Sequence, residues 1–178
     1  MAEALLITRD DLVRFTSVNG NVDTDKFIQY IKIAQDIHIQ NYLGTELLNK
    51  IKADIIASTL TGDYQSLVEV YVKPMLIHWA MVEYLPFAAY TIANKGVYKH
   101  SSENAENVAK DEVDFLLEKE RKIAQHYTQR FIDYMSFNQQ LFPEYNDNSN
   151  GDMYPDTNNN FIGWVLTLCP ILIFNNII

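Results

Sequence analysis

Five side chains of this 178-residue sequence are the best suited to metal binding or nucleophilic chemistry. They are His38, His78, His100, His126 and Cys169. None stands at a metal-ligand spacing from another, and no H-E-x-x-H, paired E-x-x-H or C-x-x-C motif occurs. A histidine on an apolar helix face is more often a hydrogen-bonded core residue than a ligand, and we interpret His38, His78 and His126 in that way. The sequence therefore predicts no metal site and no cofactor.

Glu83 is the only formal charge between Pro74 and Ala93. A carboxylate among apolar residues must be paired, exposed or shifted in pKa. One interpretation is a perturbed acid at a catalytic site. The other is a structural ion pair with a basic residue of a neighbouring helix, or a position facing a crevice. We favour the structural interpretation, because the sequence supplies no nucleophile or second acid nearby.

The remaining motifs and the composition also disfavour an enzyme. The six glycines form neither a P-loop nor a G-x-G-x-x-G fingerprint, and no G-x-S-x-G motif is present. Lys and Arg number 14 against 23 Asp and Glu, and the resulting net charge of −9 disfavours a protein that coats nucleic acid. A single cysteine excludes a disulfide framework and fits a reducing compartment. The N-terminus lacks the basic region and the long apolar run of a signal peptide.

Helical periodicity covers most of the chain up to residue 137 and predicts an all-α helical bundle. The expected helices span residues 8–16, 24–41, 45–57, 63–94 and 107–137. Thr8 and Asp63 are the expected N-caps. Gly44 and Gly96 are the expected helix ends. In the second helix the predicted inward face consists of Phe27, Tyr30, Ile31, Ala34, Ile37 and His38, and in the third it consists of Leu47, Leu48, Ile51 and Ile55.

The stretch from Pro74 to Ala93 is apolar around the whole circumference of a helix, which predicts the long central helix of the bundle. Pro74 and Pro86 each remove a backbone donor, so we expect kinks or short breaks there. A membrane span is the alternative for an apolar stretch of this length. The two prolines, Glu83 and His78 disfavour it, because polar groups are costly in lipid.

A long C-terminal helix is expected over residues 107–137, after a short extended loop at 97–102 that forms one arm of a small hairpin. This helix is on the order of 45 Å long, which suits an outer wall or a projection toward a partner. Its predicted apolar stripe consists of Val113, Leu116, Leu117, Ile123, Ala124, Tyr127, Phe131, Tyr134 and Met135.

The composition changes after the helical domain, which we assign to residues 1–142. Residues 143–160 are rich in Asn and acidic side chains, which predicts a linker that contributes no core. Residues 161–178 are apolar, β-branched and aromatic, which predicts a short extended arm broken by Pro170. The arm could fold back on its own domain, add to a neighbouring subunit or partner, or touch a membrane. Its candidate partner-binding residues are Phe161, Ile162, Trp164, Val165, Leu166, Leu168, Ile171, Leu172, Ile173 and Phe174.

An ordered set of short motifs resembles a known family. The motifs are Ile39-Gln-Asn-Tyr-Leu-Gly-Thr-Glu-Leu-Leu, Gly62-Asp-Tyr, Val72-Lys-Pro, the stretch from Trp79 to Pro86, Asn94-Lys-Gly-Val and Ser101-Ser-Glu-Asn. In this order they resemble the head–tail connector (adaptor) ring proteins of tailed bacteriophages, particularly the ring proteins of crAss-like phages. The resemblance covers about residues 25–142, with a looser match at Gly163-Trp-Val-Leu.

The resemblance implies a helical bundle that assembles as a ring, usually twelvefold, in the neck of the virion. Such a ring lies below the portal protein, joins the head to the tail, extends the DNA channel and docks the next neck or tail protein. The implied partners are other copies of the chain, the portal and that next ring, with genomic DNA passing non-specifically and no membrane. Assembly would occur in the host cytoplasm, and the family has no enzymatic residues to carry over.

Two other functions stay open at this stage. The chain could be a soluble helical binding or regulatory module whose C-terminal strand packs on itself. It could also be an enzyme built around Glu83, although no second catalytic group supports this.

Overall fold

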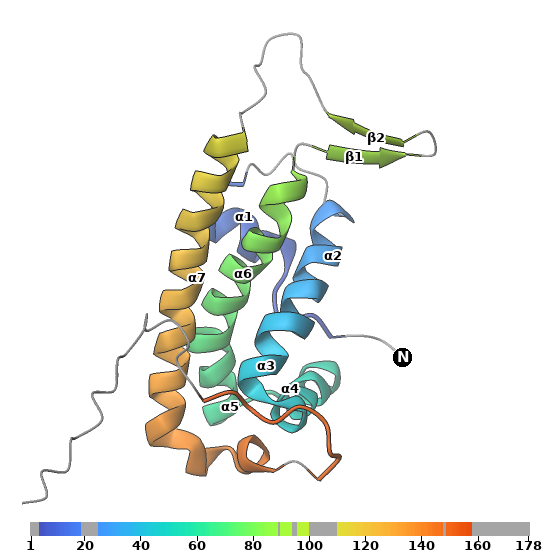
Figure 1. Cartoon of the computed structure of the whole chain (residues 1–178). Coiled ribbons are helices and arrows are strands. Elements are labelled where there is room, and N and C mark those ends of the chain that lie inside the picture. The colour runs from blue at the N-terminus through green and yellow to red at the C-terminus, as the bar shows by residue number, and fades with distance from the viewer. Residues whose placement is uncertain are drawn as a thin grey trace, which may run out of the picture.

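Helices form most of the structure, a computed structural model that describes residues 4–18, 25–88, 90–93, 96–99, 110–147 and 149–157 (Figure 1). The α-helices are α1 (Arg9–Phe15), α2 (Asp25–Ala34), α3 (Gln40–Leu43), α4 (Thr45–Ala57), α5 (Gly62–Leu67), α6 (Lys73–Tyr84) and α7 (Lys110–Asn138). The π-helical turns are η1 (Gln35–Ile39) and η2 (Val68–Val72), and the 3-10 turns are η3 (Leu85–Phe87), η4 (Gln139–Leu141) and η5 (Pro143–Asn146). The strands β1 (Tyr90–Ala93) and β2 (Gly96–Lys99) pair antiparallel. The mostly helical fold agrees with the prediction.

Helix α6 is the centre of the bundle, as its apolar circumference predicts. It lies between α7 and α2 and also contacts α1 (Figure 1). Its buried residues are Met75, Leu76, Ile77, Trp79, Ala80, Met81 and Val82. Within the described part of the chain, no helix combines the length and the apolarity needed to cross a membrane.

The breaks expected at the two prolines are confirmed. Pro74 lies in the first turn of α6, directly after the π-helical turn η2, and Pro86 lies in the 3-10 turn η3. A proline in the first turn of a helix removes only an N–H that has no helical partner. The expected cap of this segment is wrong, because Thr61 is the N-cap and Asp63 lies in the first turn of α5.

The central helix ends about ten residues earlier than expected. The chain leaves the helix after Phe87 and forms β1, so Gly96 starts strand β2 and does not end a helix. Pro86 disrupts the helical hydrogen bonds, and the Tyr-Thr-Ile sequence that follows favours a strand. The expected small hairpin is confirmed over residues 97–99, where β2 pairs with β1 and Ile92 lies opposite Val97. Residues 100–102 of the expected extended loop lie outside the described part.

The π-helical turn η1 changes which side chains point inward. Ile37 was expected in the core but is 57% exposed, whereas Gln35 and Ile39 are buried. A π-helical turn contains more residues than an α-helical turn and therefore rotates the helix face. Gln35 accepts a hydrogen bond from the Leu6 backbone N–H at 3.0 Å and donates to the Ala4 carbonyl at 3.1 Å. Its amide is thus satisfied by the N-terminal segment.

Helix α7 packs unevenly along its length. Its buried residues are Ala124, Thr128, Phe131, Ile132 and Met135, all in the second half. The expected stripe is therefore wrong at Leu116 and Ile123, which are exposed. Helix α6 runs antiparallel to α7, and the second half of α7 lies beside both η2 and α6. The inward side of the first half is only partly covered, at Val113 and Leu117.

Candidate interaction surfaces

The predicted arm residues cannot be placed. Phe161, Ile162, Trp164, Val165, Leu166, Leu168, Ile171, Leu172, Ile173 and Phe174 lie outside the described residues. The segment that leads to them is described as far as Thr157. The described chain therefore ends three residues before the arm.

A strap, residues 149–157, docks on the end of the bundle formed by α3 and α4 (Figure 1). The Thr45 backbone N–H donates to the Met153 carbonyl at 3.0 Å, and the Asp156 N–H donates to the Asn41 carbonyl at 2.8 Å. The Met153 N–H also donates to the Thr45 hydroxyl at 3.2 Å. The first two bonds use backbone groups at the end of α3 and the start of α4 that have no helical partner.

Gly44 permits this close approach. A Cβ at Gly44 would lie 2.7 Å from Pro155 Cδ, and the backbone there has a φ of +75° and a ψ of 163°. Such a conformation is essentially restricted to glycine. The sequence predicts Gly44 only as a helix end, and its contact with a proline 111 positions later could not be predicted.

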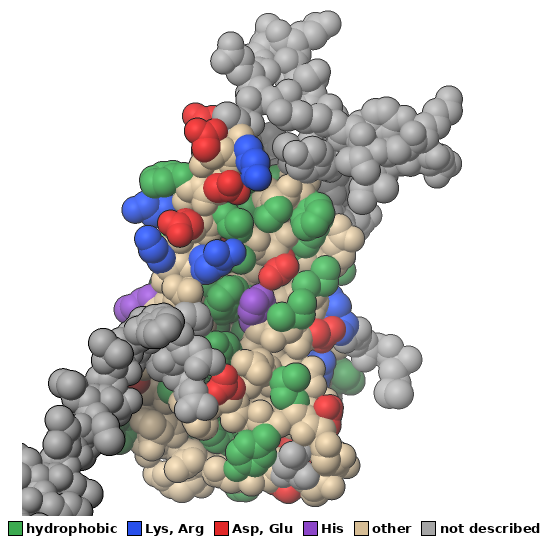
Figure 2. All heavy atoms as spheres, viewed as in Figure 1, with side chains coloured by type: hydrophobic (Ala, Val, Ile, Leu, Met, Phe, Trp, Pro, Cys, Tyr) green, Lys and Arg blue, Asp and Glu red, His purple; other side chains and the backbone are tan. Residues whose placement is uncertain are grey.

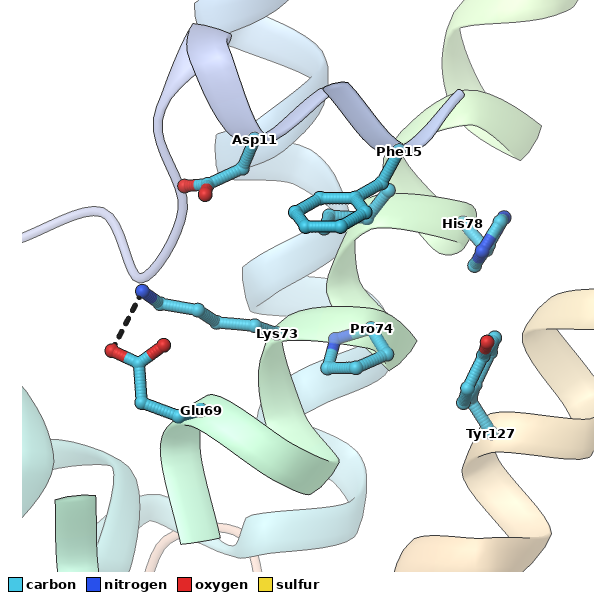
Figure 3. A pocket seen from close by; sticks show the side chains of 8 residues that line it. Asp11, Phe15, Glu69, Lys73, Pro74, His78 and Tyr127 are labelled. Carbon is cyan, nitrogen blue, oxygen red and sulfur yellow. Dashed lines mark hydrogen bonds and ion pairs between the residues drawn. The ribbon is translucent and has the colours of Figure 1, made fainter. Parts of the chain in front are cut away.

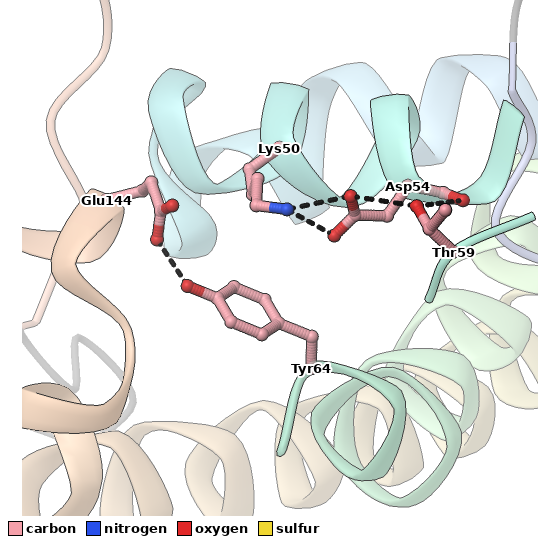
Figure 4. Close-up of polar contacts among 5 residues, drawn as sticks. All are labelled: Lys50, Asp54, Thr59, Tyr64 and Glu144. Atoms are coloured by element: carbon pink, nitrogen blue, oxygen red, sulfur yellow. Dashed lines mark hydrogen bonds and ion pairs between the residues drawn. The ribbon is translucent and has the colours of Figure 1, made fainter. Parts of the chain in front are cut away.

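The preceding residues 143–147 are also attached to the body. Tyr145 is only 3% exposed, and burial is the main cause that raises its pKa to about 12. The Tyr64 hydroxyl donates to Glu144 at 2.6 Å (Figure 4). Burial, and then this contact with Glu144, raise the pKa of Tyr64, so the phenol remains protonated over the physiological range. The expectation of a linker that contributes no core is therefore wrong at Tyr145 and Pro155, which are buried, whereas most other described residues of this segment are exposed.

An ion pair supports Tyr64 from α4. The Lys50 ammonium donates to both carboxylate oxygens of Asp54, at 2.7 and 2.6 Å, and lies 5.3 Å from the centre of the Tyr64 ring (Figure 4). The polar groups that attach η5 to the bundle are therefore paired. Composition could not reveal this, because the anchors are single residues within an Asn-rich segment.

The first half of α7 presents large apolar side chains to solvent. Phe115 is 60% exposed, and Leu116 and Ile123 are also exposed. Figure 2 shows side chains of both charge signs among apolar ones on this part of the surface. These three side chains are the candidate association surface on α7.

The candidate acid Glu83 pairs with His38. His38 Nε2–H donates to Glu83 Oε1 at 2.9 Å, and the imidazole stacks on Trp79 with 3.9 Å between ring centres. Burial is the main cause that lowers the pKa of His38; Glu83 opposes this shift, and Arg121 adds to it. His38 is therefore neutral at pH 7. His38 is therefore the partner of Glu83 that the structural interpretation requires. The contact is a hydrogen bond donated by a neutral imidazole.

The other histidines differ in their surroundings. His78 Nδ1–H donates to Glu120 at 2.5 Å, and its ring stacks on Tyr127. His126 was expected in the core, but it lies on the exposed face of α7. His100 lies outside the described part. The two half-buried imidazoles thus fix α6 against η1 and α7.

The described side chains form no cluster of three or more His, Cys, Asp and Glu that could hold a metal ion. The two histidine–glutamate pairs lie on different faces of α6, because His78 contacts α7 and Glu83 contacts η1. Each imidazole also stacks on an aromatic ring, which fixes its orientation. These pairs account for the polar residues of the central helix as structural contacts.

One family model matches the chain over residues 39–155, which is more than half of its length. Its description is "Family of unknown function (DUF6712)". No curated protein and no solved structure matches. The matched range begins at the end of η1 and includes the strap as far as Pro155, which packs on Gly44.

Proposed function

The chain belongs to the DUF6712 family, and we propose that it is a structural virion protein, a subunit of a head–tail connector ring. In this proposal about twelve copies form a ring below the portal of a tailed phage, which extends the DNA channel and docks the next neck protein. The C-terminal arm and the exposed half of α7 serve as contacts between subunits or with these partners.

The exposed first half of α7 is the observation that carries the proposal. A helix of 29 residues buries core side chains only in its second half, and its first half presents Phe115, Leu116 and Ile123. Exposed apolar side chains on a regular helix favour a protein that functions in an assembly. A closed ring joins unlike surfaces of adjacent subunits, and a helix face together with a separate arm supplies two such surfaces.

The resemblance to connector proteins supports the proposal from the sequence. Its motifs fall on parts of the fold with clear structural roles: residues 39–48 receive the strap, Tyr64 binds Glu144, and residues 79–86 lie in the core helix and η3. The net charge of −9 also suits a channel protein. A negatively charged wall does not hold the phosphate backbone, so DNA can slide past it.

The first experiment is quantitative mass spectrometry of purified particles of the phage that encodes the chain, with the portal protein as the reference. We expect a ratio to portal near one to one, since the ring shares the symmetry of the portal vertex. Absence from the particle would overturn the proposal. It would favour the alternative, a soluble helical binding module whose C-terminal strand packs on its own body.

A truncation separates these two functions. Deletion from residue 143 would also remove the buried Tyr145 and Pro155, so the informative cut is after Thr157. For a connector, the shortened chain keeps its melting temperature and fails to join the portal complex. For a self-packed module, the same deletion lowers the melting temperature.

A further inference from the structure

A groove lies between α1, η2, α6 and α7 on a surface that no predicted site residue occupies (Figure 3). It has a volume of about 350 Å³, which is at the lower end of the range of ligand pockets. Its lining residues are Asp11, Phe15, Glu69, Lys73, Pro74, Ile77, His78 and Tyr127. The groove is large enough to receive one or two bulky side chains.

The walls of the groove are aromatic and apolar. The ring of Phe15, from α1, lies over Pro74, and Tyr127 faces the same space from α7 (Figure 3). Phe15 is 58% exposed although it is a large aromatic residue. Covering such a side chain lowers the free energy by roughly 25 cal/mol for each Å² of apolar surface removed from water.

The charged groups at the groove have partners within the chain. Lys73 donates to Glu69 at 2.8 Å, and His78 donates to Glu120. Asp11 accepts the Thr8 backbone N–H at 2.8 Å in the capping box of α1. A charged ligand would have to compete with these bonds. An uncharged apolar occupant fits the site without breaking them.

The chain itself contains an occupant of this chemistry. From Thr157 to Ile178 no residue is Asp, Glu, Lys, Arg or His, and the arm carries two phenylalanines and a tryptophan in an aliphatic sequence. We propose that the groove between α1, α6 and α7 binds the apolar C-terminal segment 161–178 of a second copy of this chain. This inference rests on the proposed self-assembly and names the surfaces that meet.

The position of the strap favours a second copy over the same copy. The strap passes in front of α3 and α4, whereas α1 lies behind α6 (Figure 1). The described chain therefore ends, at Thr157, on one face of the bundle, and the groove opens beside α1 on another. From Thr157 to Phe174 an extended chain spans at most about 60 Å, which is long enough to reach a neighbour. An arm on one face and a receptor on another give a head-to-tail contact that can close a ring.

The single native cysteine, Cys169, lies within the arm and makes a direct test possible. One full-length chain carries Glu69→Cys and Cys169→Ser, so its only thiol is at the groove. It is mixed with the wild-type chain, whose only thiol is in the arm, over a series of concentrations under mild oxidation. A disulfide between positions 69 and 169 can then form only between copies, and peptide mass spectrometry quantifies it.

The matched control places the thiol elsewhere on the surface. Ser136→Cys with Cys169→Ser puts it on the exposed side of α7, away from the groove. We expect the position 69 disulfide to exceed the position 136 disulfide by about tenfold. Phe15→Ala in the groove chain should reduce the position 69 yield to the control level. Because Phe15 is largely exposed, this change should leave the melting temperature unchanged.

Two outcomes would overturn the inference. One is equal yields at positions 69 and 136, or a yield unaffected by Phe15→Ala. The other is a disulfide within one chain when Glu69→Cys is made with Cys169 retained, together with no disulfide between copies. These outcomes leave the virion measurement untouched. Conversely, specific cross-linking by a protein absent from the particle would preserve the groove and overturn the connector function.

Discussion

The two halves of α7 differ in composition and in packing. Residues 110–123 and 124–138 belong to one continuous helix, but nine of the first 14 residues are Asp, Glu, Lys or Arg, against two of the last 15. The second half buries Phe131 completely against the bundle, whereas Phe115 in the first half is 60% exposed. Helical periodicity thus locates an apolar face, but it does not say whether the partner of that face lies in the same chain.

The second half is also where polar groups are fixed inside the bundle. The Trp79 indole N–H donates to the Thr128 hydroxyl at 3.0 Å, and that hydroxyl donates to the Ala124 carbonyl at 2.9 Å. The buried Thr128 hydroxyl therefore both accepts and donates a hydrogen bond. Together these bonds fix the register of α6 on α7. The first half contributes Glu120, whose contact with His78 of α6 is partly exposed to solvent.

The largest expected effect compares one phenylalanine from each half. Phe131→Ala should lower the free energy of unfolding by about 3–5 kcal/mol, because it leaves a cavity in the core. Phe115→Ala should change it by no more than about 0.5 kcal/mol and should instead weaken association with partners. Urea denaturation followed by circular dichroism measures both values. A similar loss for both variants would contradict the distinction between the halves.

A second comparison concerns the end of the bundle that the strap covers. Gly44→Ala should cost about 1–3 kcal/mol of backbone strain and a further ~1–3 kcal/mol from overlap with Pro155. Gly62→Ala is the matched control, because Gly62 has a φ of +62° and no atom within 4 Å of an added Cβ.

Hydrogen exchange distinguishes the two glycine variants. In Gly44→Ala the amides of Met153 and Asp156, which bond to Thr45 and Asn41, should exchange faster. In Gly62→Ala their protection should stay at the wild-type level. Unchanged protection in Gly44→Ala would mean that the strap does not depend on this contact.

The smallest expected effect is a pH dependence that links the first half of α7 to the core. Burial, with a contribution from Arg121, lowers the pKa of His38 below its usual 6.5. As the pH falls through about 6.5, the unfolded chain binds a proton that the folded chain does not. Stability from this group is therefore present above pH 6.5 and decreases as the pH falls toward the lowered value.

Thermal melts between pH 8 and pH 5, values on either side of the usual histidine pKa of about 6.5, test this effect. His38→Gln should reduce the loss of melting temperature at low pH relative to the wild type. His126→Gln is the control, because His126 is exposed, and its curve should follow the wild-type curve. Identical pH dependence in all three proteins would mean that His38 does not contribute.

Much of the helical body could be predicted because its signals are local. The N-cap at Thr8 and the bounds of α4 agree with the structure, as do the breaks at Pro74 and Pro86. The errors lie where long-range contacts determine which side chains are buried. Ile37 faces solvent because η1 rotates the helix, and Leu116 faces solvent because no described element packs on its side of α7.

The candidate site was less predictable than the fold. The sequence predicts that the apolar arm is an interaction element, and this stays a prediction because the arm lies outside the described residues. It did not identify the groove, whose lining comes from α1, η2, α6 and α7, because residues as distant as Phe15 and Tyr127 meet only after folding. The single signal that could have pointed to it is Phe15 itself, an aromatic residue at the end of a short helix.

By itself the sequence determined the helical class, the apolar central helix, the acidic balance and the uncharged C-terminal segment, since each follows from composition or from periodicity along one stretch of chain. Only the tertiary structure decided that the Asn-rich segment docks on Gly44 and Thr45, that His38 is the partner of Glu83, and that Leu116 and Ile123 in the first half of α7 are exposed. These features depend on contacts between residues up to 115 positions apart, as in the hydrogen bond from Asp156 to Asn41. Local sequence preferences do not encode such contacts, because burial and hydrogen bonding depend on which distant residues the fold brings together.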